Sequence, residues 1–269
     1  IVVSTGSLYG SFSNEIIDSP PLTPQDEKNY FTGGDMGMDQ LVSINPTVDA
    51  TSYIIVKGDS FNSIENALII ADEDGTTIEI NGNPYNDPES GKNTLNAGEH
   101  FFVEGTSYSA TSPLQYMYIT SNKNIYLFQG TGDKFTQLNG RNNRHSYSAN
   151  QGMFFVPPLN CASTGDVESI AQIDEVDGGS VSSGGAFAGS AFVLSKAGST
   201  VTLNGAPIGP QAAAEIDIPI EGVDAYTIHR VNDITGDIAV VGSDELYVSY
   251  FNVNSAATSG AFYSGFTLE

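Results

Sequence analysis

Short segments in which apolar and polar residues alternate run through most of this chain, and they constrain its fold more than any other feature. Residues 76–80 alternate in this way and stop at an Asn-Gly pair at 81–82. Residues 201–203 run into a second Asn-Gly pair at 204–205. Asn-Gly favours a two-residue hairpin turn, because both central residues of a type I′ turn need positive φ. We therefore expect an antiparallel hairpin at each pair.

Further short segments are rich in β-branched or aromatic residues and are bounded by turn residues. They are Tyr53–Val56, Ala67–Ile70, Tyr116–Ile119, Ile125–Phe128, Ala191–Leu194, Ile238–Val241 and Leu246–Tyr250. The 29 glycines separate many of these segments, and no long amphipathic helix is evident. Many short strands with frequent turns are typical of sandwiches and barrels, so we expect an all-β protein of antiparallel β-sandwich-like modules.

Three motifs occur twice in the same order, which predicts an internal duplication. The matched pairs are residues 74–82 with 197–205, residues 97–101 with 214–218, and residues 119–126 with 241–247. Turn chemistry shared by unrelated β segments is the alternative explanation. The duplication predicts a first module at 50–140 and a related second module at 141–269. We expect residues 1–49 to form a strand and connector segment that packs on the first module.

The charge of the chain excludes several classes of partner. Thirty-two acidic residues stand against nine Lys and Arg, so the formal net charge is −23. This argues against nucleic acid and anionic lipid, because both are bound through Lys and Arg. No apolar run approaches about 18 residues, so we expect no membrane insertion by this segment. The chain begins at Ile1 without a signal peptide, and we expect it to be processed or part of something longer.

The residues that usually carry catalysis are sparse. There are three histidines, and no Gly-x-Ser-x-Gly elbow surrounds any serine. His100 and His229 lie in strand-like runs, where a structural imidazole is expected, and His145 lies in a polar stretch. Cys161 is the single cysteine, which excludes an internal disulfide, and we expect a buried structural thiol. Glycoside hydrolysis needs two placed carboxylates, and no pair stands out among 32 acids.

Calcium is the cofactor that the acidic composition favours, because it prefers several hard oxygen ligands. Asp72 and Asp74 lie in an acidic turn, and Asp174 and Asp177 lie in a second acidic stretch. We take these four residues as candidate calcium ligands. Solvated hairpin turns are the alternative, and neither stretch has the twelve-residue pattern of an EF-hand.

Several segments resemble the IgGFc-binding-protein N-terminal domain family found in large secreted and surface proteins of gliding-type, Bacteroidetes-like bacteria. The segments are 67–78, 95–99, 118–126, 129–132 and the most specific one, Phe155–Cys161, followed by 170–174. The resemblance covers about residues 50 to 260. It implies a β-rich extracellular module without known enzymatic activity, in proteins that often leave the cell through type IX secretion. It implies no catalytic residues.

These observations predict a non-catalytic adhesion or binding module of a secreted or cell-surface bacterial protein. Its partner would be a cell-surface glycan or protein, contacted by loops at one end of the modules through tyrosine and amide side chains. The first alternative is a structural subunit that binds copies of itself in a filament, ring or appendage. The second is a glycan-active enzyme.

Overall fold

The computed structural model describes residues 9–14, 37–42, 50–56, 65–103, 115–131, 152–159, 166–170, 189–208, 214–216, 226–234, 236–254 and 257–259. All regular elements in these ranges are β-strands, and all their hydrogen-bonded pairs are antiparallel. The predicted all-β class is therefore confirmed. A helix long and apolar enough to cross a membrane is absent from these ranges.

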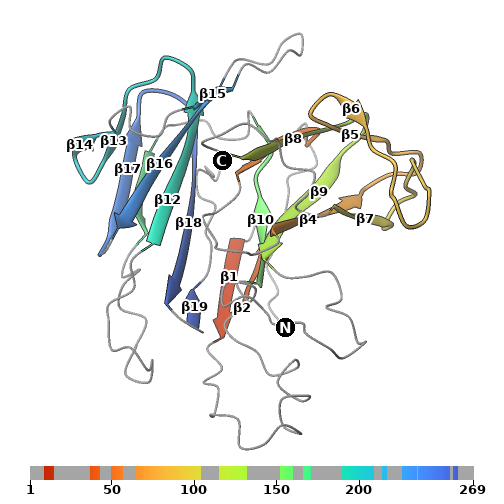
Figure 1. Cartoon of the computed structure of the whole chain (residues 1–269), viewed down its shortest axis with the longest axis horizontal. Helices are drawn as coiled ribbons and strands as arrows, with labels where there is room; N and C mark the ends of the chain where they lie inside the picture. The colour runs from red at the N-terminus through yellow and green to blue at the C-terminus, as the bar shows by residue number, and fades with distance from the viewer. Residues whose placement is uncertain are drawn as a thin grey trace, which may run out of the picture.

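The first module consists of two four-stranded sheets, coloured orange to green in Figure 1. Sheet 1 has the order β10-β9-β4-β7, with strands Gly152–Val156, Ile125–Thr131, Glu65–Ala71 and His100–Val103. Sheet 2 has the order β3-β8-β5-β6, with strands Ser52–Val56, Tyr116–Ser121, Ile78–Ile80 and Asn83–Pro84. A hairpin of β1 (Tyr9–Asn14) and β2 (Gly37–Val42) lies beside this module, with β2 against β10.

The second module consists of a five-stranded and a four-stranded sheet, coloured green to blue in Figure 1. Sheet 3 has the order β15-β16-β12-β18-β19, with strands Ala214–Ile216, Tyr226–Ile234, Gly189–Lys196, Leu246–Asn254 and Ala257–Ser259. Sheet 4 has the order β11-β17-β13-β14, with strands Asp166–Ile170, Ile238–Gly242, Val201–Leu203 and Ala206–Pro207.

The two modules share one strand order. The order β10-β9-β4-β7 in sheet 1 corresponds to β19-β18-β12-β16 in sheet 3, and sheet 2 corresponds strand by strand to sheet 4. β15 has no counterpart in the described strands of sheet 1, because it pairs with β16 on the side away from β12. The sequence match of 97–101 with 214–218 thus aligns strands at different places in the two sheets. A common origin of the modules stays a prediction.

Both Asn-Gly pairs form the predicted hairpin turns. Asn81 and Gly82 have φ of 51° and 75°, and Asn204 and Gly205 have φ of 49° and 78°. The asparagine side chains also fasten each turn to the neighbouring strand. Asn81 Oδ1 accepts a hydrogen bond from the backbone N–H of Tyr118 at 2.9 Å, and Asn204 Oδ1 accepts one from Ala239 at 2.8 Å. Asparagine therefore supplies both the backbone conformation and an acceptor.

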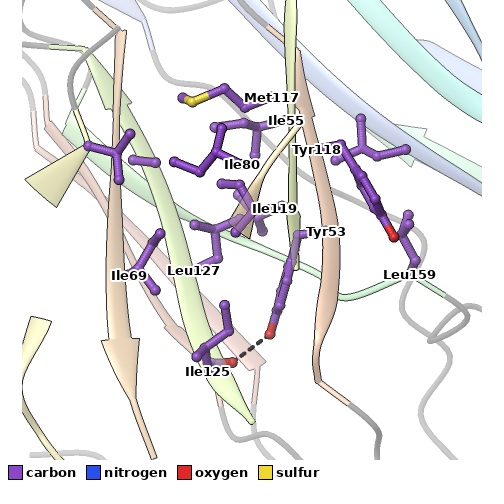
Figure 2. Packing of buried hydrophobic residues seen from close by; sticks show 14 of the residues in the cluster. Tyr53, Ile55, Ile69, Ile80, Met117, Tyr118, Ile119, Ile125, Leu127 and Leu159 are labelled. Carbon is purple, nitrogen blue, oxygen red and sulfur yellow. Dashed lines mark hydrogen bonds between the residues drawn. The ribbon is translucent and has the colours of Figure 1, made fainter. Parts of the chain in front are cut away.

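The core of the first module lies between sheets 1 and 2 (Figure 2). Ile69 and Leu127 from sheet 1 face Ile55 and Ile119 from sheet 2, and all four are fully buried. The hydroxyl of Tyr53 donates a hydrogen bond to the carbonyl oxygen of Ile125 at 2.5 Å, which joins the two sheets within the core. A buried polar group with a partner avoids the cost of desolvation without compensation.

The same buried cluster continues into the second module. It includes five residues of sheet 3: Phe192, Leu194, Tyr226, Ile228 and Tyr247. Along β12, Phe192 and Leu194 alternate with Ala191 and Val193, which belong to the core between sheets 3 and 4. Sheet 3 is therefore buried on both faces, with one face in its own module and the other against the first module.

The chain also crosses the predicted join between the modules. β10 begins at Gly152, beyond the expected boundary at residue 141, and it pairs with β9 in the first module. Residues 141–151 lie outside the described part of the chain. The division at residues 50–140 and 141–269 stays a prediction.

Candidate functional site

The acidic turn that follows β4 was predicted to hold calcium. Asp72 and Asp74 are both exposed there. Asp74 Oδ1 accepts a hydrogen bond from the N–H of Ala97 at 2.9 Å, so it fastens the turn to the segment before β7. The ammonium group of Lys123 donates to the carbonyl oxygen of Asp74 at 2.5 Å and lies 3.8 Å from Glu73 Oε2. In this conformation, two oxygens of Asp74 that could bind a metal, Oδ1 and the carbonyl oxygen, already accept hydrogen bonds within the protein.

A cluster of three or more Asp, Glu, His or Cys side chains suited to a metal is absent from the described ranges. Asp174 and Asp177, the other two candidate ligands, lie outside those ranges. Calcium at Asp72, Asp74, Asp174 and Asp177 therefore stays a prediction. Cys161 and His145 also lie outside the described residues.

The two described histidines occupy different environments. His100 is exposed at the start of the edge strand β7. His229 lies on β16, with Nε2 3.4 Å from the hydroxyl oxygen of Ser195, while its buried Nδ1 has no hydrogen-bond partner among the described residues. Burial lowers the pKa of His229 from 6.5. Ser195 is 1% exposed, whereas His229 is partly exposed, so the hydroxyl of this pair is buried and the imidazole is only partly so.

The outer face of sheet 1 carries a row of apolar side chains, although it points away from the core of its module, and the exposed His100 lies opposite Ile70 on the same face. Phe102, Leu68, Phe128 and Phe155 form one cross-strand row over β7, β4, β9 and β10. With neighbouring strands about 4.8 Å apart, the row is about 14 Å long. The rings of Phe128 and Phe155 meet edge to face, with centroids 5.7 Å apart. An antiparallel sheet with one free face normally carries polar residues there.

Exposure differs along this row. Phe102, Leu68 and Phe128 are partly exposed, whereas Phe155, on the strand that lies against β2, is fully buried. Ile70 and Tyr126 form a second, partly exposed pair beside the row. We call Leu68, Ile70, Phe102, Tyr126 and Phe128 the outer apolar face.

Polar side chains lie near the end of the outer apolar face that carries Tyr126. The hydroxyl of Tyr126 interacts with the carboxylate of Asp72. Burial is the larger cause that raises the pKa of Tyr126, and the Asp72 carboxylate raises it further. Glu99 lies before β7, where the N–H of Asn96 and the ammonium group of Lys92 lower the pKa of its carboxyl. A surface with an apolar centre and a polar rim has the anatomy of a protein recognition site.

Several strand ends of the first module lie together. Glu65, Val103, Thr131 and Gly152 lie at one end of sheet 1, as the strand registers show. Val56 of sheet 2 lies at the same end, because Gln129 Nε2 donates to its carbonyl oxygen at 2.8 Å. The opposite end carries the described turns at 72–77 and 122–124. The acidic turn with Asp72 and Asp74 therefore lies at the opposite end of the module from Glu65 and Val56.

A model of the family described as IgGFc binding protein matches residues 22–255. This chain belongs to the IgGFc binding protein family. The predicted resemblance to this family is confirmed, whereas its setting in gliding-type bacteria stays a prediction, and the match begins within the N-terminal segment instead of near residue 50. Membership in this family supports a binding module.

No curated protein matches the chain. Among solved structures, a lectin from Pleurotus ostreatus in complex with GalNAc aligns with 10% identity over 84% of this chain and 80% of that chain, with a TM-score of 0.22. Its apo form aligns with 14% identity over 79% and 74%, with a TM-score of 0.20. A glycosyl hydrolase family 2 member from Bacteroides cellulosilyticus aligns with 10% identity over 84% and 32%, with a TM-score of 0.19. These scores are too low to carry an argument about fold or function.

Sequence reasoning missed the outer apolar face. The signal was present in the apolar runs at 67–71 and 125–128, where the alternation expected of a half-buried strand is lost. Such a run indicates a strand that is apolar on both faces. It does not indicate which face will meet the core of the module and which will point away from it.

Proposed function

We propose that this chain is a non-catalytic binding module of a secreted or cell-surface protein, of the type found in bacterial adhesins. Its partner is a cell-surface glycan or protein. The observation that carries the proposal is the outer apolar face, which lies on a sheet whose other face already fills the core. Partly exposed apolar surface with a polar rim favours association with a partner, because contact removes that surface from water.

The geometry offers little support for catalysis. The hydroxyl of Ser195 beside His229 is buried, and the acidic side chains at the turns, Asp74 and Glu99, accept hydrogen bonds from backbone N–H groups. A rigid scaffold that presents one face and the strand ends of one module suits recognition. Family membership supports the same interpretation.

The experiment is a binding screen on an array of defined neutral and acidic oligosaccharides and purified extracellular proteins. Compounds that bind are then titrated against a double variant, Leu68→Thr with Phe128→Thr, which keeps strand propensity while making the face polar. Val241→Thr is the matched control, because Val241 is 50% exposed on β17 in the second module. We expect at least a tenfold loss of affinity in the double variant and no loss in the control.

Binding that is equal in the double variant and the control would rule out the outer apolar face. Release of reducing ends from an oligosaccharide, abolished by one carboxylate substitution, would show an enzyme instead. Light scattering on a sizing column, in salt with calcium and again with chelator, tests self-assembly. A discrete oligomer in either condition would favour the structural-subunit alternative.

A further inference from the structure

A buried carboxylate lies at the junction between the two modules. Glu245 ends the turn between β17 and β18, and it is 4% exposed. Its Oε2 accepts a hydrogen bond from the hydroxyl of Tyr226 at 3.1 Å and lies 3.4 Å from Lys196 Nζ. Its Oε1 is in hydrogen-bond contact with the hydroxyl of Tyr247. Each carboxylate oxygen therefore has a partner from a different strand of sheet 3.

Tyr247 connects this carboxylate to the first module. Its hydroxyl also lies 3.0 Å from the carbonyl oxygen of Pro158, in the segment that follows β10. A hydroxyl has one proton, so Tyr247 donates to one of its two acceptors at a time. The next residue, Leu159, donates its N–H to the carbonyl oxygen of Ser52 at the start of β3, at 2.8 Å. This backbone bond holds the Pro158 segment against sheet 2, so the Tyr247 hydroxyl reaches a fixed point of the first module.

The corresponding position in the first module is occupied differently. Asn124 directly precedes β9 as Glu245 directly precedes β18, and its Oδ1 accepts the N–H of Ala50 within the same module. The first module thus uses a neutral side chain for a local contact. The second module places a carboxylate there, and one of its partners, Tyr247, also contacts the Pro158 carbonyl oxygen of the first module. The difference points to a role for Glu245 at the junction.

We propose that the Glu245 cluster, formed by Glu245, Lys196, Tyr226 and Tyr247, is a joint that fixes the angle between the two modules. The apolar cluster around it supplies the affinity between the modules, but apolar contact has little directional preference. A buried ion pair adds little net stability, because desolvation offsets its attraction. Its hydrogen bonds require a particular geometry, so the cluster selects one orientation of sheet 3 against the first module.

A fixed angle has a consequence for recognition. The outer apolar face belongs to the first module, and any partner that also touches the second module meets both surfaces in one arrangement. Less conformational freedom is then lost on binding. The joint itself does not depend on the proposed binding function, so either proposal can fail without the other.

The test measures the distance between spin labels on the two modules by double electron–electron resonance. Labels are placed at Asn93→Cys and Val241→Cys, which are exposed positions in the first and second modules, in a chain that also carries Cys161→Ser. The joint is perturbed by Tyr247→Phe and, separately, by Glu245→Gln. Tyr53→Phe is the matched control, because it removes a buried tyrosine hydroxyl whose hydrogen bond to Ile125 stays within the first module.

We expect one narrow distance distribution in the parent chain and in Tyr53→Phe, and at least a twofold broader one in Tyr247→Phe and Glu245→Gln. Circular dichroism confirms that each variant is folded, and Glu245→Gln decides the matter if Tyr247→Phe does not fold. Distributions as narrow in the folded joint variants as in Tyr53→Phe would overturn the proposal, because the apolar cluster alone would then set the angle.

Discussion

Asn81 offers the sharpest test of how sequence chemistry stabilises this fold. It combines a positive φ of 51° with a side-chain acceptor for the N–H of Tyr118. Asn81→Ala places a Cβ-bearing residue without an amide in the left-handed region, at a cost of about 1–2 kcal/mol. The lost hydrogen bond costs about 1 kcal/mol more. We therefore expect Asn81→Ala to lower the free energy of unfolding by about 2–3 kcal/mol.

Two further substitutions separate these contributions. Asn81→Gly tolerates the positive φ but lacks the acceptor, so we expect a loss of about 1–2 kcal/mol, which includes the greater freedom of glycine in the unfolded chain. Asn81→Asp keeps an acceptor and tolerates the left-handed region, so we expect a loss below about 0.5 kcal/mol. Urea denaturation followed by circular dichroism measures all three. Equal losses for Asn81→Ala and Asn81→Gly would refute the assigned cost of backbone strain.

Three other predictions address the core, the partly buried His229 and calcium. Leu127→Ala, in the core of the first module, should cost about 2–5 kcal/mol in urea denaturation, whereas Val241→Ala at an exposed position should cost below about 0.5 kcal/mol. Burial lowers the pKa of His229 from 6.5, so near and below that pH the folded chain binds fewer protons than the unfolded chain. The contribution of neutral His229 to stability is therefore full above pH 6.5. It is lost as the pH falls from 6.5 towards the pKa of the folded state. His229→Gln should therefore reduce the fall in Tm between about pH 7.5 and 5.5, and an unchanged fall would contradict this assignment. Calcium at Asp72 and Asp74 predicts a rise in Tm on adding calcium that Asp72→Asn with Asp74→Asn removes, and equal Tm in calcium and chelator would argue against the site.

The sequence predicted local features well because their causes are local. Alternation and short apolar runs identified many of the strands, but not β1, β2, β10 or β11. The Asn-Gly pairs at 81–82 and 204–205 identified two hairpins whose φ angles agree with a type I′ turn. The family resemblance rested on short motifs in order, and these are also readable without a structure. The acidic turn at Asp72 and Asp74 was recognised as a turn, but its contact with Ala97 depends on a segment 23 residues away.

Strand pairing and module packing depended on contacts that leave no local signal. The amino-acid pattern of β10 does not show that it returns to pair with β9, nor does that of β15 show that it pairs with β16. The apolar run at Ala67–Ala71 showed a strand with two apolar faces, and only the tertiary structure decided that Leu68 and Ile70 lie outside the core.

The sequence by itself therefore determined the all-β class, many of the strands, the two Asn-Gly turns, the charge and the family, because each depends on residues that are neighbours in the chain. The tertiary structure alone decided that sheet 3 is buried on both faces and that Glu245 meets Tyr226 and Tyr247 at the junction of the modules. Burial of a carboxylate is a property of its surroundings, and those surroundings form only when segments far apart in the chain pack together.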